Sequence, residues 1–385
     1  MFSYLPLIFR NGVRNRRRSV LTVLSIAASF CLLGVLMAMY TLFFLTPASP
    51  DQALRLITRN RISFTNTMPM AYEQQVRRVP GVREVTVYDF FGGTYKDSRD
   101  AKNSFGRFAI EPKNLFIIHP EYSIPEAEKM EFIRRRDACI LGRPIAERLG
   151  LKIGDRITLV GDIFRVDLNL LLVGIYDSPV DNLALFFSYD YLNESFHGKL
   201  DQAIMFMLIA DSPASVGPVA RSIDDMFRNS TTQTKTETEK GVQLSFLSYI
   251  GNVKLFLLAV CASLTGTVLL VSANTMAMSV RERVAEVGIL KTLGFTREVI
   301  LWMIIGEAML LAIFGGAVGF MIAQGFIMLL RKLPVPFVNL TGLAISPGVA
   351  AAGLLLGAMV GLFSSALPAW GASRRNIIDC LRLAD

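Results

Sequence analysis

Few side chains in this chain have the types and spacing that catalysis requires. Its two histidines, His119 and His197, lie far apart in the sequence, and no cluster of cysteine or carboxylate ligands accompanies either one. A zinc site or a histidine-dependent nucleophile needs such groups nearby. The chain also lacks the pattern Gly-x-x-x-x-Gly-Lys-Ser/Thr that cradles ATP phosphates. We therefore expect no catalytic, cofactor-binding or metal-binding site in this chain.

One ionisable residue, Glu307, interrupts an otherwise apolar run from Val299 to Leu330. A carboxylate inside a membrane span is costly and often functional, so a proton relay is one hypothesis. Glu307 lies only ten residues after Arg297, which indicates a position near the membrane interface. That position favours the second hypothesis, a structural hydrogen bond or a role beside the helix that precedes the run.

The segment 281–297 carries the sharpest local pattern. Four apolar residues spaced three apart are expected to share one narrow face of a short helix: Val284, Val287, Leu290 and Leu293. Glu282, Glu286 and Lys291 mark the polar side, and Gly294 suits a helix end. Such a helix either rests at the membrane interface or inserts its apolar face into a groove on a partner protein.

Four long apolar runs must position these residues. They are Ser19–Pro50, Leu255–Val280, Val299–Leu330 and Leu333–Ser373. Each is longer than the roughly 20 residues needed to cross a hydrocarbon core about 30 Å thick. A hydrophobic content of 52% and a mean hydropathy of +0.43 agree with a membrane protein. The first run is too long for a cleaved signal peptide. The sequence predicts an α-helical membrane protein with four transmembrane helices and a mixed α/β domain inserted between helices 1 and 2.

The charges around the runs predict the orientation. The flanks before span one, between spans two and three and after span four hold twelve bases and five acids, whereas residues 51–250 hold 25 bases and 26 acids. The positive-inside rule therefore places both termini and the 281–297 loop in the cytoplasm. The net charge of +8 gathers at membrane edges, which argues against nucleic acid as a partner.

Together these signals give the expected domain boundaries. The ranges are 1–18 for the N-terminal segment, 19–46 for span one, 47–245 for the extracytoplasmic domain with a β-rich subdomain at about 121–184, 250–280 for span two, 281–297 for the loop helix, 298–330 for span three, 347–370 for span four and 371–385 for the tail. Ser346-Pro347 is typical of a helix start.

The inserted segment predicts alternating helices and strands. Helices are expected at 70–79, 144–149 and 214–227, and strands at 53–58, 82–88, 156–160, 163–168, 170–175 and 203–209. The polar tract Asn229–Lys240 is interpreted as a linker or stalk. Cys139 is the only extracytoplasmic cysteine, so this domain holds no internal disulfide. The pairs Phe90-Phe91 and Phe186-Phe187 either contact an apolar cargo or, as burial statistics favour, fill a sheet core.

Glycines recur every four residues in two of the runs. The series are Gly315 and Gly319, then Gly353, Gly357 and Gly361. Small residues at this spacing let transmembrane helices approach closely. Packing within one protomer and packing across a dimer both remain open.

The pattern Arg-Glu-Arg-x-x-Glu-x-Gly-Ile-Leu-Lys-x-Leu-Gly at 281–294, followed by Glu307 and Gly-Gly-x-x-Gly at 315–319, resembles the FtsX-like permease domain of ABC transporters. The segments 15–22 and 367–375, with Asp379, resemble that family's lead into span one and its closing segment. One departure is Asn376-Ile377-Ile378, where many members place a proline. The inserted part resembles the MacB-type periplasmic core domain more loosely, through 79–82 and 149–155.

The resemblance implies the permease subunit of a MacB/LolC-type ABC transporter in the inner membrane of a bacterial cell. A separate ABC ATPase would bind ATP and Mg and dock on the loop helix. The contacts carried over from the family are Glu282, Glu286, Gly288, Leu290, Leu293 and Gly294. Other implied partners are membrane lipids, a second copy or close paralogue and, in tripartite exporters, a periplasmic adaptor with an outer-membrane channel.

The implied mechanism is mechanotransmission, in which spans one and two act as levers on the extracytoplasmic domain and drive export or extraction of a substrate. The alternative is an FtsX-like signalling subunit that activates an extracytoplasmic cell-wall hydrolase. A third class, a membrane-anchored enzyme or receptor without an ATPase, leaves the loop motif unexplained.

Overall fold

The computed structural model describes residues 16–47, 49–97, 99–162, 165–179, 182–198, 200–282, 284–331 and 340–374. The chain divides into two compact units. One is a helical unit made of residues 1–46, 252–332 and 342–385, and the other is an inserted domain made mainly of residues 47–251. The sequence features at Asn15, Arg375, Asn376, Asp379 and Cys380 lie outside the described residues.

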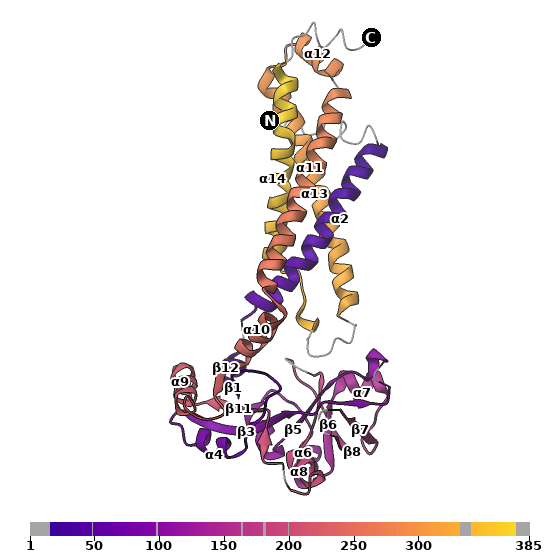
Figure 1. The fold of residues 1–385 in the computed structure, drawn as a ribbon. Coiled ribbons are helices and arrows are strands. Elements are labelled where there is room, and N and C mark those ends of the chain that lie inside the picture. The colour runs from indigo at the N-terminus through magenta and orange to yellow at the C-terminus, as the bar shows by residue number, and fades with distance from the viewer. Residues whose placement is uncertain are drawn as a thin grey trace. The chain divides into compact units, whose positions relative to one another are not determined.

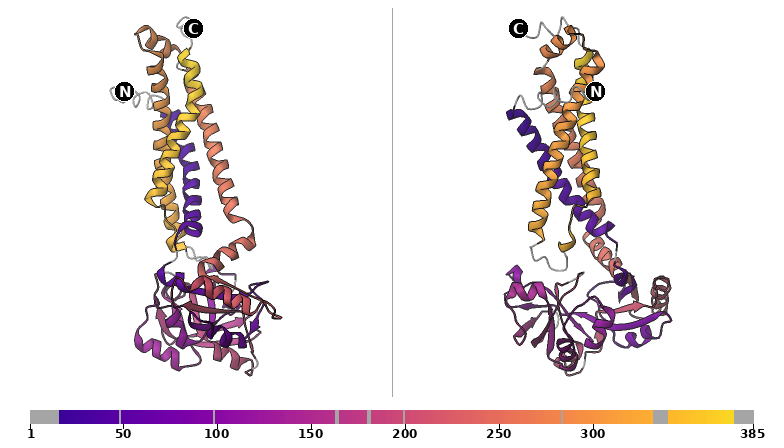
Figure 2. Two further views of the ribbon diagram at one scale, coloured as in Figure 1. Left: turned by 90° about the vertical axis from the view of Figure 1, so that its left-hand side faces the viewer. Right: turned by 180° about the vertical axis from the view of Figure 1, so that it is seen from behind.

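Among the described residues, the helical unit contains four helices that are long and apolar enough to cross a membrane. They are α2 (Arg16–Tyr40) with its π-helical extension η2 (Thr41–Leu45), α11 (Val253–Glu282), α13 (Arg297–Leu330) and α14 (Pro347–Arg374). Figures 1 and 2 show them running alongside one another, with the short helix α12 (Val284–Thr292) between α11 and α13 in the chain. The predicted four-helix architecture is confirmed. The start of α14 is also confirmed, because the Ser346 hydroxyl accepts a hydrogen bond of 3.3 Å from the Val349 amide just before Pro347 opens the helix.

Small residues bring the helices of this unit close together. A Cβ on Gly319 of α13 would lie 2.5 Å from the carbonyl oxygen of Ala27 on α2, and one on Gly361 of α14 would lie 2.7 Å from the Cα of Met309 on α13. The other glycines of the two series likewise face neighbouring helices of the same chain: Gly315, Gly353 and Gly357. These close contacts lie within one protomer.

A ten-stranded mixed sheet organises the inserted domain, in the order β12-β1-β11-β3-β5-β9-β6-β8-β7-β4 (Figure 1). The strands are β1 (Arg55–Asn60), β3 (Val82–Phe90), β4 (Gly93–Tyr95), β5 (Gly106–Ile110), β6 (Ala138–Gly142), β7 (Arg156–Gly161), β8 (Asp167–Tyr176), β9 (Ala184–Ser188), β11 (Met205–Ala210) and β12 (Thr234–Thr238). A separate two-stranded sheet joins β2 (Met68–Pro69) to β10 (Gln202–Ala203).

The first four strands of that order form a split βαβ arrangement. Helix α4 (Ala71–Arg77) connects β1 to β3, and α9 (Val216–Met226) connects β11 to β12, with antiparallel pairing between neighbours. This is the ferredoxin-like pattern. Residues 91–203, called here the nested segment, are inserted between β3 and β11. Its helices are α5 (Pro112–Ile118), α6 (Glu126–Arg134), α7 (Arg143–Leu149) and α8 (Tyr189–Ser195).

Two further helices flank the domain along the chain. Helix α3 (Pro50–Leu54) precedes β1, and α10 (Glu239–Ile250) follows β12. Each begins with a side-chain cap: the Ser49 hydroxyl accepts from the Gln52 amide at 3.3 Å, and the Thr238 hydroxyl accepts from the Gly241 amide at 3.1 Å. Chain continuity then joins α3 to span one and α10 to span two.

The structure confirms most of the predicted elements and corrects three. The helices expected at 70–79, 144–149 and 214–227 are α4, α7 and α9. The tract 229–240 is not a plain linker, since Thr234–Thr238 form the edge strand β12, whose polar composition hid it. The strands expected at 163–168 and 170–175 are one strand, β8, although residues 163 and 164 lie outside the described chain. The strand expected at 53–58 begins only at Arg55, after α3.

Three of the four phenylalanines in the aromatic pairs lie in the sheet core. Phe91, Phe186 and Phe187 have no solvent exposure, and the rings of Phe91 and Phe187 meet edge to face at 5.8 Å. Phe90 is only half-buried, so the core interpretation is confirmed for Phe91 and for the Phe186-Phe187 pair. Cys139 is a buried free thiol of the same sheet, and burial raises its pKa.

Candidate functional site

The candidate site is the short helix α12 together with the ends of the spans around it. Helix α12 ends at Thr292, and Gly294, predicted to cap it, follows two residues later with a φ of +90°. The amides of Gly294 and Phe295 donate to the carbonyl oxygens of Lys291 and Leu290, each at 3.1 Å. This pair of bonds defines a Schellman cap, and glycine adopts its left-handed conformation without strain.

The apolar residues of α12 and of the turn that follows it point in two directions. Val284 and Val287 are each 5% exposed, whereas Ile289 is 52% and Leu293 is 70% exposed. The single apolar face expected from Val284 to Leu293 is therefore wrong. Residues nine apart are separated by about two and a half turns at 3.6 residues per turn, so the first and last residues of that series lie on opposite sides of the helix.

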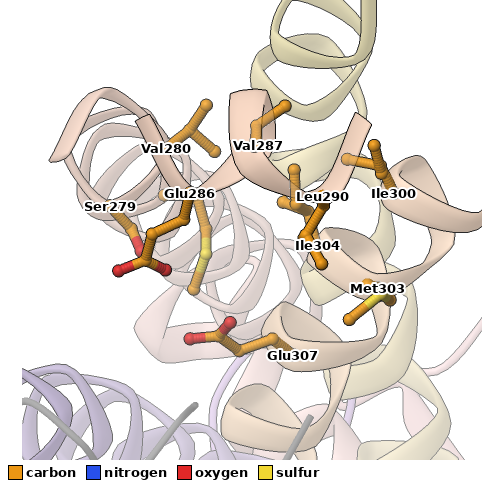
Figure 3. Close-up of a pocket in the computed structure, with 10 residues that line it drawn as sticks. Ser279, Val280, Glu286, Val287, Leu290, Ile300, Met303, Ile304 and Glu307 are labelled. Atoms are coloured by element: carbon orange, nitrogen blue, oxygen red, sulfur yellow. The ribbon is translucent and has the colours of Figure 1, made fainter. Parts of the chain in front are cut away.

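The inner side of α12 closes a small pocket of about 50 Å³. Its lining comes from three helices: Met276, Ser279 and Val280 of α11, Glu286, Val287 and Leu290 of α12, and Ile300, Met303, Ile304 and Glu307 of α13. Figure 3 shows the side chains of Glu286 and Glu307 reaching into this space. Glu307 is 8% exposed. The volume is sufficient for ordered water, which polar groups of this kind hold in place.

A cation connects α12 to the fourth span. The ammonium Nζ of Lys291 donates a hydrogen bond of 2.8 Å to the carbonyl oxygen of Ser373, in the last turn of α14. Carbonyl groups at a helix C-terminus carry partial negative charge, so a lysine there satisfies an otherwise open acceptor. Helix α12 is thus packed against α11 and α13 and bonded to α14.

The six residues carried over from the family do not share one surface. Glu282, Leu293 and Gly294 are exposed, Glu286 and Leu290 are half-buried in the pocket lining, and Gly288 is buried. A role in ATPase docking stays a prediction for each of them. Sequence reasoning missed Ile289, although its spacing of four from Leu293 is a signal for a shared helix face.

Within the described residues, no group of three or more histidine, cysteine, aspartate or glutamate side chains could hold a metal ion. His119 is instead buried in the inserted domain, with Nδ1 3.3 Å from Glu121 Oε1 and Nε2 3.2 Å from Met207 Sδ. The pocket beside α12 is lined by apolar side chains together with Ser279, Glu286 and Glu307.

Two family profiles match the chain. Residues 19–226 match the MacB-like periplasmic core domain, and residues 253–377 match the FtsX-like permease C-terminal region. The first match includes span one and most of the inserted domain, and the second includes α11, α12, α13 and α14.

Individual relatives carry related names. An uncharacterized ABC transporter permease of Methanocaldococcus jannaschii is 26% identical over 320 residues, which cover 80% of this chain and 77% of that protein. Another, from Mycobacterium tuberculosis, is 26% identical over 272 residues, and the alignment spans 66% of this chain but only 30% of that relative. Among solved structures, the extracellular domain of the noncanonic ABC-type transporter YknZ from Gram-positive bacteria aligns with a TM-score of 0.36 at 12% identity, covering 48% of this chain and 98% of that one.

Proposed function

The chain belongs to the family of MacB-like periplasmic core domain proteins, and we propose that it transmits force from a separate ABC ATPase to its periplasmic domain. At the coarser level it is an ABC transporter permease of the MacB/FtsX type. In the proposal the chain lies in the inner membrane with both termini and α12 in the cytoplasm. ATP and Mg bind to the partner ATPase, and movement of the domain drives a substrate that is already outside the membrane.

The observation that carries this proposal is the two-sided character of α12. Ile289 and Leu293 are four residues apart and exposed, while Val284 and Val287 on the other side are buried. An exposed apolar pair on a short helix suits a hydrophobic groove on a partner protein. A partner that moves this pair would displace α11 and α13 through the buried valines and α14 through Lys291.

The sheet of the inserted domain is the part to which spans one and two are connected along the chain. Span one leads through α3 into β1, and β12 leads through α10 into span two. β1 and β12 are antiparallel neighbours, with Leu56 opposite Thr238. A displacement of either span therefore arrives at adjacent strands of one sheet. This arrangement supports mechanotransmission to the domain as a whole.

The test is the affinity between the full-length permease, purified in detergent, and its cognate ABC ATPase. Burying a whole leucine or isoleucine contributes about 1.5–3 kcal/mol, so at these exposures each side chain should contribute about 1–2 kcal/mol. The double variant Ile289→Ala/Leu293→Ala should weaken the complex by about 30- to 700-fold, since the two side chains together contribute about 2–4 kcal/mol and 1.4 kcal/mol is tenfold in Kd.

Leu355→Ala is the matched control, because Leu355 on α14 is 67% exposed and lies away from α12. It should leave the affinity unchanged. Wild-type affinity in the double variant would refute docking through this face. Leu290→Ala alters the pocket side of α12, so it should keep the complex but lower the stimulation of ATPase activity. Loss of the complex in this variant would mean that the ATPase docks on the pocket side, which contradicts the proposal.

A further inference from the structure

A buried arginine joins three separate segments of the periplasmic domain. Arg55, the first residue of β1, is completely buried. Its Nε lies 2.7 Å from Oε2 of Glu239, and its Nη1 lies 2.7 Å from Oε1 of Glu121. The same Nη1 donates at 3.2 Å to the carbonyl oxygen of Ile118. The guanidinium fork thus holds two carboxylates and a main-chain acceptor at once.

Arg55 and its partners belong to three segments of the domain: the one that follows span one, the one that leads to span two, and the nested segment. Arg55 follows span one by way of α3, and Glu239 is the first residue of α10, which leads to span two. Ile118 and Glu121 belong to the nested segment, in and just after α5. The amide Nε2 of Gln52 in α3 also lies 3.5 Å from Oε1 of Glu239. Both connections to the membrane are therefore bonded to each other and to the nested segment at a single point.

A contribution to folding stability does not by itself explain why Arg55 is buried here beside its two carboxylate partners. Two buried charges lose so much hydration that apolar residues of the same volume often stabilise a fold equally well. What an ion pair adds is direction, because each guanidinium N–H must point at its acceptor. Burial opposes ionisation of Glu121, but a hydrogen bond from His119 and the charge of Arg55 hold the pKa of that carboxyl below its usual value.

A second arginine on the same strand gives a natural comparison. Arg59 lies four residues further along β1 and is also buried. Its Nη2 is 2.9 Å from Oε2 of Glu237 on β12, its Nη1 donates to the carbonyl oxygen of Asn60, and its guanidinium lies 4.0 Å from the centre of the Phe64 ring. These described contacts connect β1 to β12 and to the loop after β1, outside the nested segment.

We propose that Arg55 is a positioning residue that makes the nested segment move as one body with the two segments attached to spans one and two. The inference rests on the proposed function, since it names where a displacement of the spans is passed to the far part of the domain. Without the Arg55 contacts, β1 and α10 still follow the spans, but the nested segment follows only through the sheet, the His119–Met207 contact and the apolar core that Ile118 shares with β1 and β11.

The first test measures a distance within the domain of the full-length permease in nanodiscs, without ATPase. Spin labels go on exposed Gln243 of α10 and exposed Ala127 of α6, with the four native cysteines replaced by serine. The test variant is Arg55→Met with Glu121→Gln and Glu239→Gln, so that no buried charge is left alone. We expect its distance distribution to broaden by about twofold, because a segment released from its anchor samples more positions. Arg59→Met with Glu237→Gln is the matched control and should keep the wild-type width.

The second test adds the ATPase and ATP–Mg, with labels on Ala127 and on exposed Leu355 of span four, a span that is not a lever in the proposal. Wild type should show an ATP-dependent shift that the Arg55 triple variant loses, while its ATPase rate stays near that of wild type. A merely structural residue would lower both together. Arg55→Lys, which keeps the charge without the fork, should give intermediate behaviour, and it decides the question if the triple variant does not fold.

A narrow, wild-type distance distribution in the Arg55 variants would overturn the inference. So would equal broadening in the Arg59 control. If instead wild type shows no ATP-dependent shift, the proposed function fails, and the ATPase-free measurement still reports on Arg55 separately.

Discussion

The close contact between spans one and three gives a quantitative prediction for Gly319→Ala. The added Cβ would lie 2.5 Å from the carbonyl oxygen of Ala27, whereas ordinary contact begins near 3.4 Å. The obstacle is main chain and cannot rotate away, so α2 and α13 must separate locally by up to about 1 Å. Overpacking of this kind costs about 1–3 kcal/mol. Alanine returns up to about 1 kcal/mol through its higher helix propensity.

We therefore expect Gly319→Ala to lower the free energy of unfolding of the helical unit by about 1–2 kcal/mol. Gly316→Ala is the matched control in the same helix, because its Cβ would meet the Phe30 ring at 3.5 Å, an ordinary contact. That variant should be neutral or slightly stabilised. The order of the two variants, rather than either absolute value, is the sharp prediction.

Tryptophan fluorescence during SDS titration is a selective assay for this effect. The chain has two tryptophans, Trp302 on α13 and Trp370 on α14, so the signal reports on the helical unit alone. Equal midpoints for Gly319→Ala and Gly316→Ala would refute the close approach of the two helices. A lower SDS midpoint for Gly316→Ala than for Gly319→Ala would contradict the predicted order of the two variants.

Two further predictions concern single polar contacts. Burial raises the pKa of Asp89 from 3.8 to about 7, against hydrogen bonds from the Ile204 and Met205 amides that lower it. The protonated carboxyl stabilises the fold fully below about pH 4, and this contribution is lost as the pH rises through 7. The hydrogen-exchange protection of β3 and β11 should therefore decline over that interval, and Asp89→Asn should reduce the decline by at most about 4 kcal/mol. An unaltered decline in the variant would contradict the prediction. Lys291→Met removes the 2.8 Å bond to Ser373 and should weaken protection of the α12 amides by about 0.5–1.5 kcal/mol, with α13 unaffected. Unchanged exchange in α12 would show that the lysine does not hold the helix.

Much of the architecture could be predicted because it depends on local properties of the sequence. A span is recognisable from the number of consecutive apolar residues, and Gly294 caps α12 because its left-handed φ suits glycine. The short helices at 71–77, 143–149 and 216–226 follow from periodicity and from nearby proline or glycine.

The missed features depend on partners distant in the sequence. Thr234–Thr238 alternate with Lys and Glu and look solvated, yet they form a strand because β1 offers an edge to pair with. Arg55 looks like a surface residue until Glu121 and Glu239 are brought to it from 66 and 184 positions away. The two-sided packing of α12 likewise depends on where α11 and α13 begin and end, which no local pattern contains.

The groove formed by Gly315 and Gly319 has a consequence for how the protein is made. Span one fits this groove, but almost three hundred residues separate Ala27 from Gly319. At about 5–20 residues per second, synthesis of that interval takes roughly 15–60 s. During this time span one has no contact with span three, and the whole inserted domain is synthesised before Gly319. The contact between span one and span three can therefore form only after the whole inserted domain has been synthesised.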